Sequence, residues 1–304
     1  MEMNRKQLLL LNLLGLGKKG LLSDFIAHAG KNKLNFGNSA AVASLLQWYG
    51  NEIGERKLKN VTQQRVKDVA EMVRSVFDLL DKMECLCFPP LDNGYPSGLL
   101  SLIDNKNHVI YPPFVFIKGP VGLLASVYAT IIGSNLTNAV SDNCLAFLFS
   151  ELHKSGKTVL IPLNINGSPA LVRLSLSAGV VPVLLVAGGL DLYLDDFENE
   201  YLSLVLDVLD AGGTIVSVQL PGSKLSETVK IKTLLYIAGF SKNVVFSRLP
   251  SVNYESAVLE SARINGSQVF VVDNGFIRAD EVVQSLGNEA TILKSGIRLC
   301  GLTD

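Results

Sequence analysis

The sequence has few of the residues that build metal centres. It contains four cysteines and three histidines, and none of them shows the spacing typical of metal ligands. One Cys-x-Cys is too short for a structural zinc site without a second pair or added histidines. The residues concerned are Cys85, Cys87, Cys144, Cys300, His28, His108 and His153. We therefore expect no bound metal, and reduced structural cysteines in a cytosolic protein.

Enzyme motifs are missing too. The chain has no G-x-S-x-G turn, no phosphate-binding P-loop and no H-E-x-x-H zinc motif. Gly15-x-Gly17-x-x-Gly20 imitates a dinucleotide fingerprint, but leucine-rich helical sequence precedes it, and no acidic residue stands about 20 positions later. A tight turn between two helices explains these glycines. The sequence predicts a protein that is not an enzyme and binds no cofactor.

The chain also has no large excess of positive or negative charge and no long apolar run. The net charge is −1, so no global basic field attracts nucleic acid, and such binding would need a local patch. No stretch reaches about 18 apolar residues, which predicts no membrane span. Arg5 and Lys6 before the leucine run at 8–16 imitate a signal peptide, but Asn12 interrupts the run and no small-residue cleavage site follows. We expect a cytoplasmic protein without membrane contact.

Helical periodicity dominates the first part of the chain. Apolar residues recur at helix spacing over 8–14, 19–29, 40–49 and 63–82. After residue 88 the pair Pro89-Pro90 marks a boundary. The sequence predicts a small all-helical domain over 1–88, of the SAM or helix-hairpin-helix type, followed by a second domain over 89–304.

Beyond residue 89, strand and helix patterns alternate. We expect strands at 114–117, 128–132, 158–162, 181–186, 214–218, 244–247 and 268–272, and helices at 138–155, 169–178, 198–211, 227–238 and 254–264. Strands that alternate with helices form right-handed βαβ units. The low share of charged residues, 18%, fits a sheet covered on both faces. The predicted fold class is α/β, with a Rossmann-like, doubly wound, mostly parallel sheet.

The stretch at 111–135, YPPFVFIKGPVGLLASVYATIIGSN, is central to this second domain. Two apolar runs end abruptly in Gly133-Ser134-Asn135. Open α/β sheets bind their ligands outside the carboxyl ends of such strands. The turn either presents backbone amides to an anion or joins a strand to a helix without binding anything.

The order of these segments resembles the DNA-processing protein A (DprA/Smf) family. Residues 8–22 match the family's helical domain, and NGYPSGLL at 93–100 and PPFVFIKG at 112–119 match the entry to its Rossmann-like domain. Ile131-Ile132-Gly133-Ser134 matches the start of the family motif I-V-G-[ST]-R. Further matches are AGGLD at 187–191 followed by Asn199-Glu200, IAGFS at 237–241, and the strand at 269–272. The resemblance covers residues 20–290 and depends on the order and spacing of the motifs.

This resemblance implies a bacterial cytosolic protein that binds single-stranded DNA. Members help to load a RecA-type recombinase during DNA uptake and natural transformation, the state called competence, and so act in DNA recombination. They form a homodimer through the Rossmann-like domain and are not known as enzymes.

The chain departs from the family where DNA should bind. The family's arginine after G-[ST] is Asn135 here, and both arginines of its R-N-R-I-I-A-G-L-S helix are absent from 233–241. Its S-G-x-A-x-G-I-D loop aligns with 161–168, where Pro162 and Asn166 replace glycines and Ser168 replaces the acid. Phosphate binding depends on closely approaching amides and on cations that release counterions. We therefore expect an eroded phosphate-binding site and weak DNA binding.

A basic stretch near the lost arginines could restore positive charge. It holds five cations and one acid, Glu227: the cations are Lys224, Lys230, Lys232, Lys242 and Arg248. They form either a residual phosphate-binding strip or a solvated face. Together with Gly133, Ser134 and Asn135 they are the predicted DNA- or phosphate-binding residues, and no residue is predicted to be catalytic.

Other interpretations remain open. Asp191, Asp195 and Asp196 cluster after a predicted strand, where they either meet a metal or a ribose or form a solvated loop. The second domain could instead sense a nucleotide or another small ligand through the loops at Gly133 and Gly188-Gly189, or serve as a scaffold without a ligand.

Overall fold

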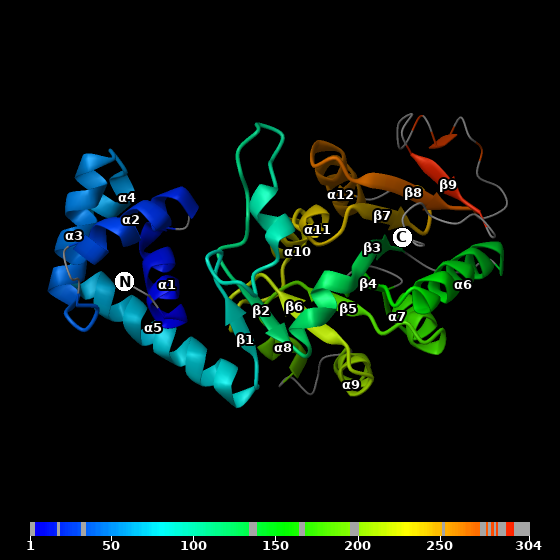
Figure 1. Ribbon diagram of the computed structural model, residues 1–304, viewed down its shortest axis with the longest axis horizontal. Coiled ribbons are helices and arrows are strands. Elements are labelled where there is room, and N and C mark those ends of the chain that lie inside the picture. Colours follow the sequence, from blue (N-terminus) through cyan, green and yellow to red (C-terminus); the bar gives the residue numbers. More distant parts are fainter. Residues whose placement is uncertain are drawn as a thin grey trace. The chain divides into compact units, whose positions relative to one another are not determined.

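The computed structural model describes residues 4–16, 19–31, 35–133, 139–163, 168–194, 201–250, 253–273, 278, 281–282, 284 and 290–294. The chain divides into two compact units, one formed by Met1–Tyr95 with Pro113–Val115 and the other by Pro96–Pro112 with Phe116–Asp304. Figure 1 shows the elements of both units.

The first unit is built from helices. They are α1 (Arg5–Leu11), α2 (Lys19–Lys31), α3 (Ser39–Glu52), α4 (Arg56–Lys59) and α5 (Gln63–Lys82), with a π-helical turn at Asn12–Leu16 and a short strand, β1 (Leu86–Phe88). The five apolar residues that α5 repeats at helix spacing are all buried: Val66, Val69, Val73, Val76 and Leu80. The side chain of Thr62 caps this helix by accepting the Arg65 N–H at 3.1 Å.

Two glycines let the short helix α4 pack closely inside this unit. A Cβ at Gly50 would lie 2.7 Å from both the Leu58 Cβ and the Lys59 nitrogen. Gly15 has a φ of +123° and also faces Leu58. Leu58 itself is fully buried. Gly15 therefore forms a kink between two helical segments and does not follow a strand, which agrees with the interpretation of its motif as a turn between helices.

The second unit contains an open sheet. Its strands are β2 (Val115–Lys118), whose first residue belongs to the first unit, β3 (Val127–Ile132), β4 (Thr158–Pro162), β5 (Val183–Val186), β6 (Thr214–Ser217), β7 (Asn243–Phe246), β8 (Gln268–Val272) and β9 (Thr291–Leu293). They lie in the order β2-β6-β5-β4-β3-β7-β8-β9. All neighbours pair in parallel except β2 and β6, which are antiparallel. The central strands are buried along nearly their whole length, as a sheet covered on both faces requires.

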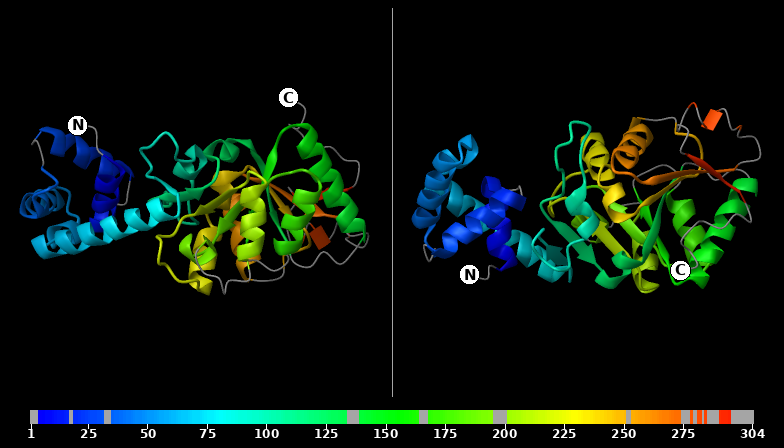
Figure 2. Two further views of the ribbon diagram at one scale, coloured as in Figure 1. Left: turned by 90° about the horizontal axis from the view of Figure 1, so that it is seen from below. Right: turned by 45° about the horizontal axis from the view of Figure 1, so that its top comes forward.

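Helices cover both faces of the sheet. They are α6 (Ala139–Lys154), α7 (Ser168–Ser177), α8 (Asp191–Leu194), α9 (Leu202–Asp210), α10 (Glu227–Leu234), α11 (Ile237–Phe240) and α12 (Asn253–Ile264), with 3₁₀ turns at Ser97–Ser101 and Val121–Ser126. Figure 1 shows α6, α7 and α9 on one side of the strands and α10, α11 and α12 on the other. Figure 2 shows the same elements from two further directions. The chain therefore reverses its winding direction after β6, which makes the sheet doubly wound.

The predicted α/β class and the mostly parallel, Rossmann-like sheet are confirmed. All seven predicted strands are present, and those at 158–162 and 268–272 have the predicted bounds. The structure adds β1 and β9, each only three residues long and too short to give a periodic signal. No helix among the described residues is long and apolar enough to cross a membrane.

One predicted helix, 227–238, is interrupted. It forms α10 and α11, which are separated at Leu235 and Tyr236, where the Tyr236 N–H bonds to the Thr233 carbonyl at 3.2 Å. After the break, α11 packs against the 3₁₀ turn at Ser97–Ser101, and a Cβ at Gly239 would lie 2.6 Å from the Leu99 Cδ2. The need to bring Gly239 this close to the 3₁₀ turn explains a break that helical periodicity alone does not show.

Candidate functional site

The candidate site lies where the sheet reverses its winding direction. Strand β3 is paired with β4 on one side and with β7 on the other, both in parallel. The chain leaves β3 towards α6 and leaves β7 towards α12, and these helices cover opposite faces (Figure 1). The carboxyl ends of two such strands flank a crevice in which open α/β sheets bind ligands.

Gly133 and Ser247 follow β3 and β7 directly and lie against one another at this crevice. The Ser247 N–H donates to the Ile132 carbonyl at 2.8 Å, which extends the β3–β7 pairing by one residue. A Cβ at Gly133 would lie 2.8 Å from the Ser247 Cβ and closer still to its Oγ, so this position has room only for glycine. Ser247 Oγ is buried and has no hydrogen-bond partner among the described residues. A buried hydroxyl group that still needs a hydrogen-bond partner therefore lies at this edge of the sheet.

Arg248 adds a partly neutralised charge beside this hydroxyl group. Its Nη2 lies 3.5 Å from Oε1 of Glu255, a residue on α12 that is only 1% exposed. The Nε of Arg248 is buried and, among the described residues, has no partner. A guanidinium group carries several N–H donors in a fixed plane, so Arg248 can hold Glu255 and still donate from Nε. The buried carboxylate lowers the positive charge that a ligand would meet.

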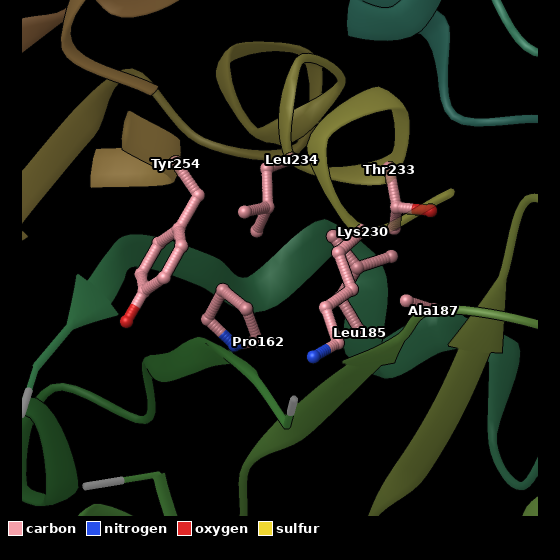
Figure 3. Close-up of a pocket in the computed structure, with 7 residues that line it drawn as sticks. All are labelled: Pro162, Leu185, Ala187, Lys230, Thr233, Leu234 and Tyr254. Carbon is pink, nitrogen blue, oxygen red and sulfur yellow. The ribbon is translucent and has the colours of Figure 1, made fainter. Parts of the chain in front are cut away.

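A small hollow lies over the ends of β4 and β5. It encloses about 270 Å³, open solvent included, and it is lined by Pro162, Leu185, Ala187, Lys230, Thr233, Leu234 and Tyr254. Figure 3 shows the Lys230 ammonium group and the Tyr254 hydroxyl group on either side of Pro162, with the aliphatic side chains between the helices and the strand ends. The hollow is therefore apolar, with one cation and one phenol at its margin.

Lys230 is already paired inside its own helix. Its Nζ lies 2.7 Å from Oε1 of Glu227, one turn earlier on α10. The Lys230 side chain is 26% exposed and that of Glu227 is 70% exposed. Because Glu227 is mostly in water, this ion pair is weak and can exchange for another anion.

The structure distributes the predicted basic residues over several places. Lys230 and Arg248 lie at the carboxyl edge of the sheet. Lys224 is exposed in the loop before α10, and Lys232 is exposed in the last turn of α10. Lys242 is exposed and directly precedes β7, so the length of that strand separates it from Arg248. Of the turn predicted as Gly133-Ser134-Asn135, Gly133 is described, whereas Ser134 and Asn135 lie outside the described residues.

The loop after β5 is held by its own neighbours. Asp191 Oδ1 accepts the Gly222 N–H at 2.8 Å, and the Gly189 N–H donates to the Ser223 carbonyl at 2.9 Å. Ser217 Oγ donates to the Gly188 carbonyl at 2.6 Å. Asp191 thus ties two loops together, while Asp195 and Asp196 lie outside the described residues. In the part of the chain that the structure describes, no three histidine, cysteine, aspartate or glutamate side chains group as a metal site would need.

Three residues of this region carry no sequence signal that we recognised. Ser247, Tyr254 and Glu255 belong to the end of β7 and the start of α12. A serine directly after a buried strand is a weak indication of a site at the sheet edge. Glu255 shows no such signal, because its burial follows from the packing of α12 and not from the local pattern.

Comparison with solved structures identifies the fold. The X-ray structure of DNA processing protein A from Streptococcus pneumoniae is similar over 97% of this chain and 96% of that chain, with a TM-score of 0.66 and 16% sequence identity. DNA processing protein A from Helicobacter pylori, a structure that describes its mode of single-stranded DNA binding, is similar over 68% of this chain and 90% of that chain, with a TM-score of 0.54 and 14% identity. No protein-family model and no curated protein matches the sequence. The likeness confirms the fold that the resemblance predicts.

Proposed function

We propose, from the premise that this chain has the fold of DNA processing protein A, that it binds single-stranded DNA and catalyses no reaction on it. The observation that carries the proposal is the pair of unpartnered donors at the crevice, Ser247 Oγ and Arg248 Nε. Both are buried polar atoms without a partner among the described residues, and buried polar atoms of folded proteins normally bond to protein, ordered water or a ligand. These two are neighbours in the chain and lie together at the carboxyl edge of the sheet. A hydroxyl and a guanidinium N–H are suitable donors to a phosphate oxygen.

The same geometry supports the interpretation that the phosphate site is eroded. Each of the two cations at the carboxyl edge faces a carboxylate, Arg248 with Glu255 and Lys230 with Glu227. A bound phosphate therefore competes with acids that are already present. Ser168 donates to the Pro162 carbonyl, so the residue that replaces the family's acid holds the local backbone. These contacts favour DNA binding that is weaker and less dependent on salt than that of a site with free arginines.

The proposal also covers the oligomeric state, the location and the cellular role of the protein. We infer a homodimer formed through the Rossmann-like unit, a cytoplasmic location, and a role in DNA recombination and natural transformation in which the protein hands single strands to a RecA-type recombinase. The similarity to the two DNA processing protein A structures supports this role through the shared fold. Crosslinking, and pull-down with a purified RecA-type recombinase, test the dimer and the partner separately.

Titration with fluorescent oligo-dT at several salt concentrations tests the DNA-binding proposal. We expect binding at low salt, and weaker binding with a preserved fold when the crevice hydroxyl is removed by Ser247→Ala. Loss of one hydrogen bond to phosphate corresponds to about 1.5 kcal/mol, or roughly tenfold in Kd. The matched control is Ser241→Ala, because Ser241 Oγ donates within the protein, to the Tyr128 carbonyl at 2.9 Å. Ser241→Ala should lower stability and leave the DNA affinity of the folded protein unchanged. Absence of oligo-dT binding by the wild-type protein at low salt would refute the proposal.

The hollow of Figure 3 favours a second candidate function, the sensing of a nucleotide or another small anionic ligand. Apolar walls with a few polar groups at the margin are typical of small-ligand sites. A ligand that binds only the folded state raises the melting temperature, so a thermal-shift screen with nucleotides tests this alternative. If neither oligo-dT nor a nucleotide binds, a scaffold role without a ligand is the remaining interpretation.

A further inference from the structure

A cluster of cations on the helical unit suggests a second nucleic-acid contact. The segment 56–67 carries five basic residues and no acid: Arg56, Lys57, Lys59, Arg65 and Lys67. Its density of positive charge contrasts with the net charge of −1 of the whole chain. All five side chains are exposed, and none takes part in the ion pairs found among the described residues.

Packing fixes the cations of α4 on the solvent side. Leu58 is the buried residue of this short helix, and it is held closely by Gly50 and Gly15. Because Leu58 points inward, Arg56, Lys57 and Lys59 on either side of it remain in water. Because this packing prevents α4 from rotating about its axis, the three charged side chains stay in contact with solvent.

Arg65 lies where helix electrostatics disfavours a cation. The first turn of this 20-residue helix contains no acidic residue, and Arg65 occupies its third position. The positive end of the helix dipole normally attracts acids and repels cations. The nearest following acid, Asp68, accepts a hydrogen bond from Gln64 Nε2 at 2.7 Å. The segment thus concentrates positive potential at a cost to stability, and a bound anion would remove that cost.

We propose that the segment 56–67 binds the phosphate backbone of single-stranded DNA, as a contact separate from the crevice at the carboxyl edge of the sheet. The proposal rests on the single-stranded DNA binding proposed above and adds a second surface to it. Exposed lysines and arginines without carboxylate partners release counterions from phosphates when they bind, so each contact contributes to the salt dependence of affinity. The crevice differs in this respect, because Lys230 and Arg248 both face acids, and a phosphate that binds there competes with a carboxylate.

The test compares two variants with the same change of charge. The first replaces all five cations of the segment, as R56Q/K57Q/K59Q/R65Q/K67Q. The control replaces five other solvent-accessible cations that likewise take no part in the ion pairs among the described residues, as R74Q/K106Q/K157Q/R263Q/K294Q. Oligo-dT affinity is measured by fluorescence anisotropy over a range of salt concentrations. For a single strand, each lost phosphate contact reduces the slope of log K against log salt by about 0.7.

We expect the segment variant to lose about 2 to 3.5 units of this slope, and the control to keep the wild-type slope within about half a unit. Melting followed by circular dichroism verifies the fold, and the segment variant should melt at the same temperature as the wild type or higher, because cations have been removed from the positive end of a helix. The melting curve therefore distinguishes a loss of affinity caused by unfolding from one caused by the loss of phosphate contacts.

The contrary outcomes are distinct. If the wild-type protein binds oligo-dT and the segment variant binds it with the same slope and affinity, the second surface does not exist and the proposed function stands. If both variants lose affinity equally, only net charge matters and the inference is wrong. If the wild type does not bind, both the proposed function and the inference fail. If the segment variant keeps its DNA affinity but loses retention on immobilised poly-glutamate, the segment contacts acidic proteins, which also overturns the inference.

Discussion

Gly133 and Ser247 lie so close together at the ends of β3 and β7 that a Cβ on residue 133 would be 2.8 Å from the Cβ of Ser247. Side-chain atoms that are not bonded do not approach this closely without displacement. The glycine therefore allows the two strand ends to meet, and it places the serine hydroxyl in the crevice.

Replacement of Gly133 by alanine should disturb both stability and binding. The added methyl group has to displace Ser247 or the end of β3, and overpacking of this kind costs about 1–3 kcal/mol. Urea denaturation measures the loss. Gly122→Ala is the control, because a Cβ there would meet nothing within 4 Å. Equal stability of the two variants would mean that the strand ends separate easily and that the close contact is not required.

Substitution of the two partners of the Glu227–Lys230 ion pair should change the affinity for DNA in opposite directions. Lys230→Gln removes a cation from the margin of the hollow and should reduce the salt slope of oligo-dT binding by about 0.7. Glu227→Gln removes the acid 2.7 Å from Lys230 Nζ and should strengthen binding, because the lysine no longer has a competing partner. The side chain of Glu227 is 70% exposed, so neither change should affect folding strongly. A decrease in affinity for both variants would contradict this role of Lys230.

Ile103 and Val109 form an antiparallel bridge that closes a short hairpin, and Asn265 holds this hairpin onto the rest of the second unit. Its Oδ1 accepts the Ile103 N–H at 2.9 Å, and its Nδ2 donates to the Ile103 carbonyl at 3.1 Å. Asn265→Asp removes the donor and places a negative charge beside that carbonyl, which should cost about 1–3 kcal/mol. Faster proteolysis between residues 103 and 109 would report the detachment. Asn105→Asp is the control, because Asn105 makes an exposed bond to Glu260, and it should leave the proteolysis rate nearly unchanged.

The described cysteines should be inert towards alkylating reagents. Cys85, Cys87 and Cys144 are buried and form no disulfide bond among the described residues. Burial is the main cause that raises the pKa of the Cys87 thiol from its ordinary value of 9.0 to about 12, with the Arg5 charge opposing the rise and the Asp92 charge adding to it. Only the thiolate reacts, and three pKa units correspond to about a thousandfold less thiolate at pH 8. In a Cys300→Ser background, we expect no iodoacetamide labelling of the native protein within hours, and rapid labelling in denaturant.

Labelling of Cys87 should stay slow up to about pH 11, since the Cys87 thiol loses its proton only as the pH approaches 12. Rapid native labelling at pH 8 would show that the thiol is accessible and ionised, and that β1 opens readily.

Local patterns were sufficient for most elements of the fold. The strand at 158–162 and the helix at 63–82 have the predicted bounds, because a buried parallel strand is a continuous apolar run and an amphipathic helix repeats its apolar residues every three or four positions. The order of motifs also predicted the fold shared with DNA processing protein A. Gly133 directly follows β3, as the pattern predicts, and its part in binding stays a prediction.

The site itself depends on contacts between segments far apart in the sequence. Ser247 reaches Gly133, 114 positions earlier, only because β7 pairs with β3. The basic residues that are near each other in the sequence, Lys242 and Arg248, lie at opposite ends of β7.

The sequence by itself thus determined the elements, their order and the class of sheet, since these follow from hydrophobic periodicity within short segments. Tertiary structure alone decided which donors share the crevice and that Arg248 faces a buried carboxylate, whereas the Glu227–Lys230 pair lies within one helix. The physical reason is that hydrophobic burial selects each segment locally, whereas the partner of a charge or hydroxyl group is set by strand pairing and helix packing, which no local pattern encodes.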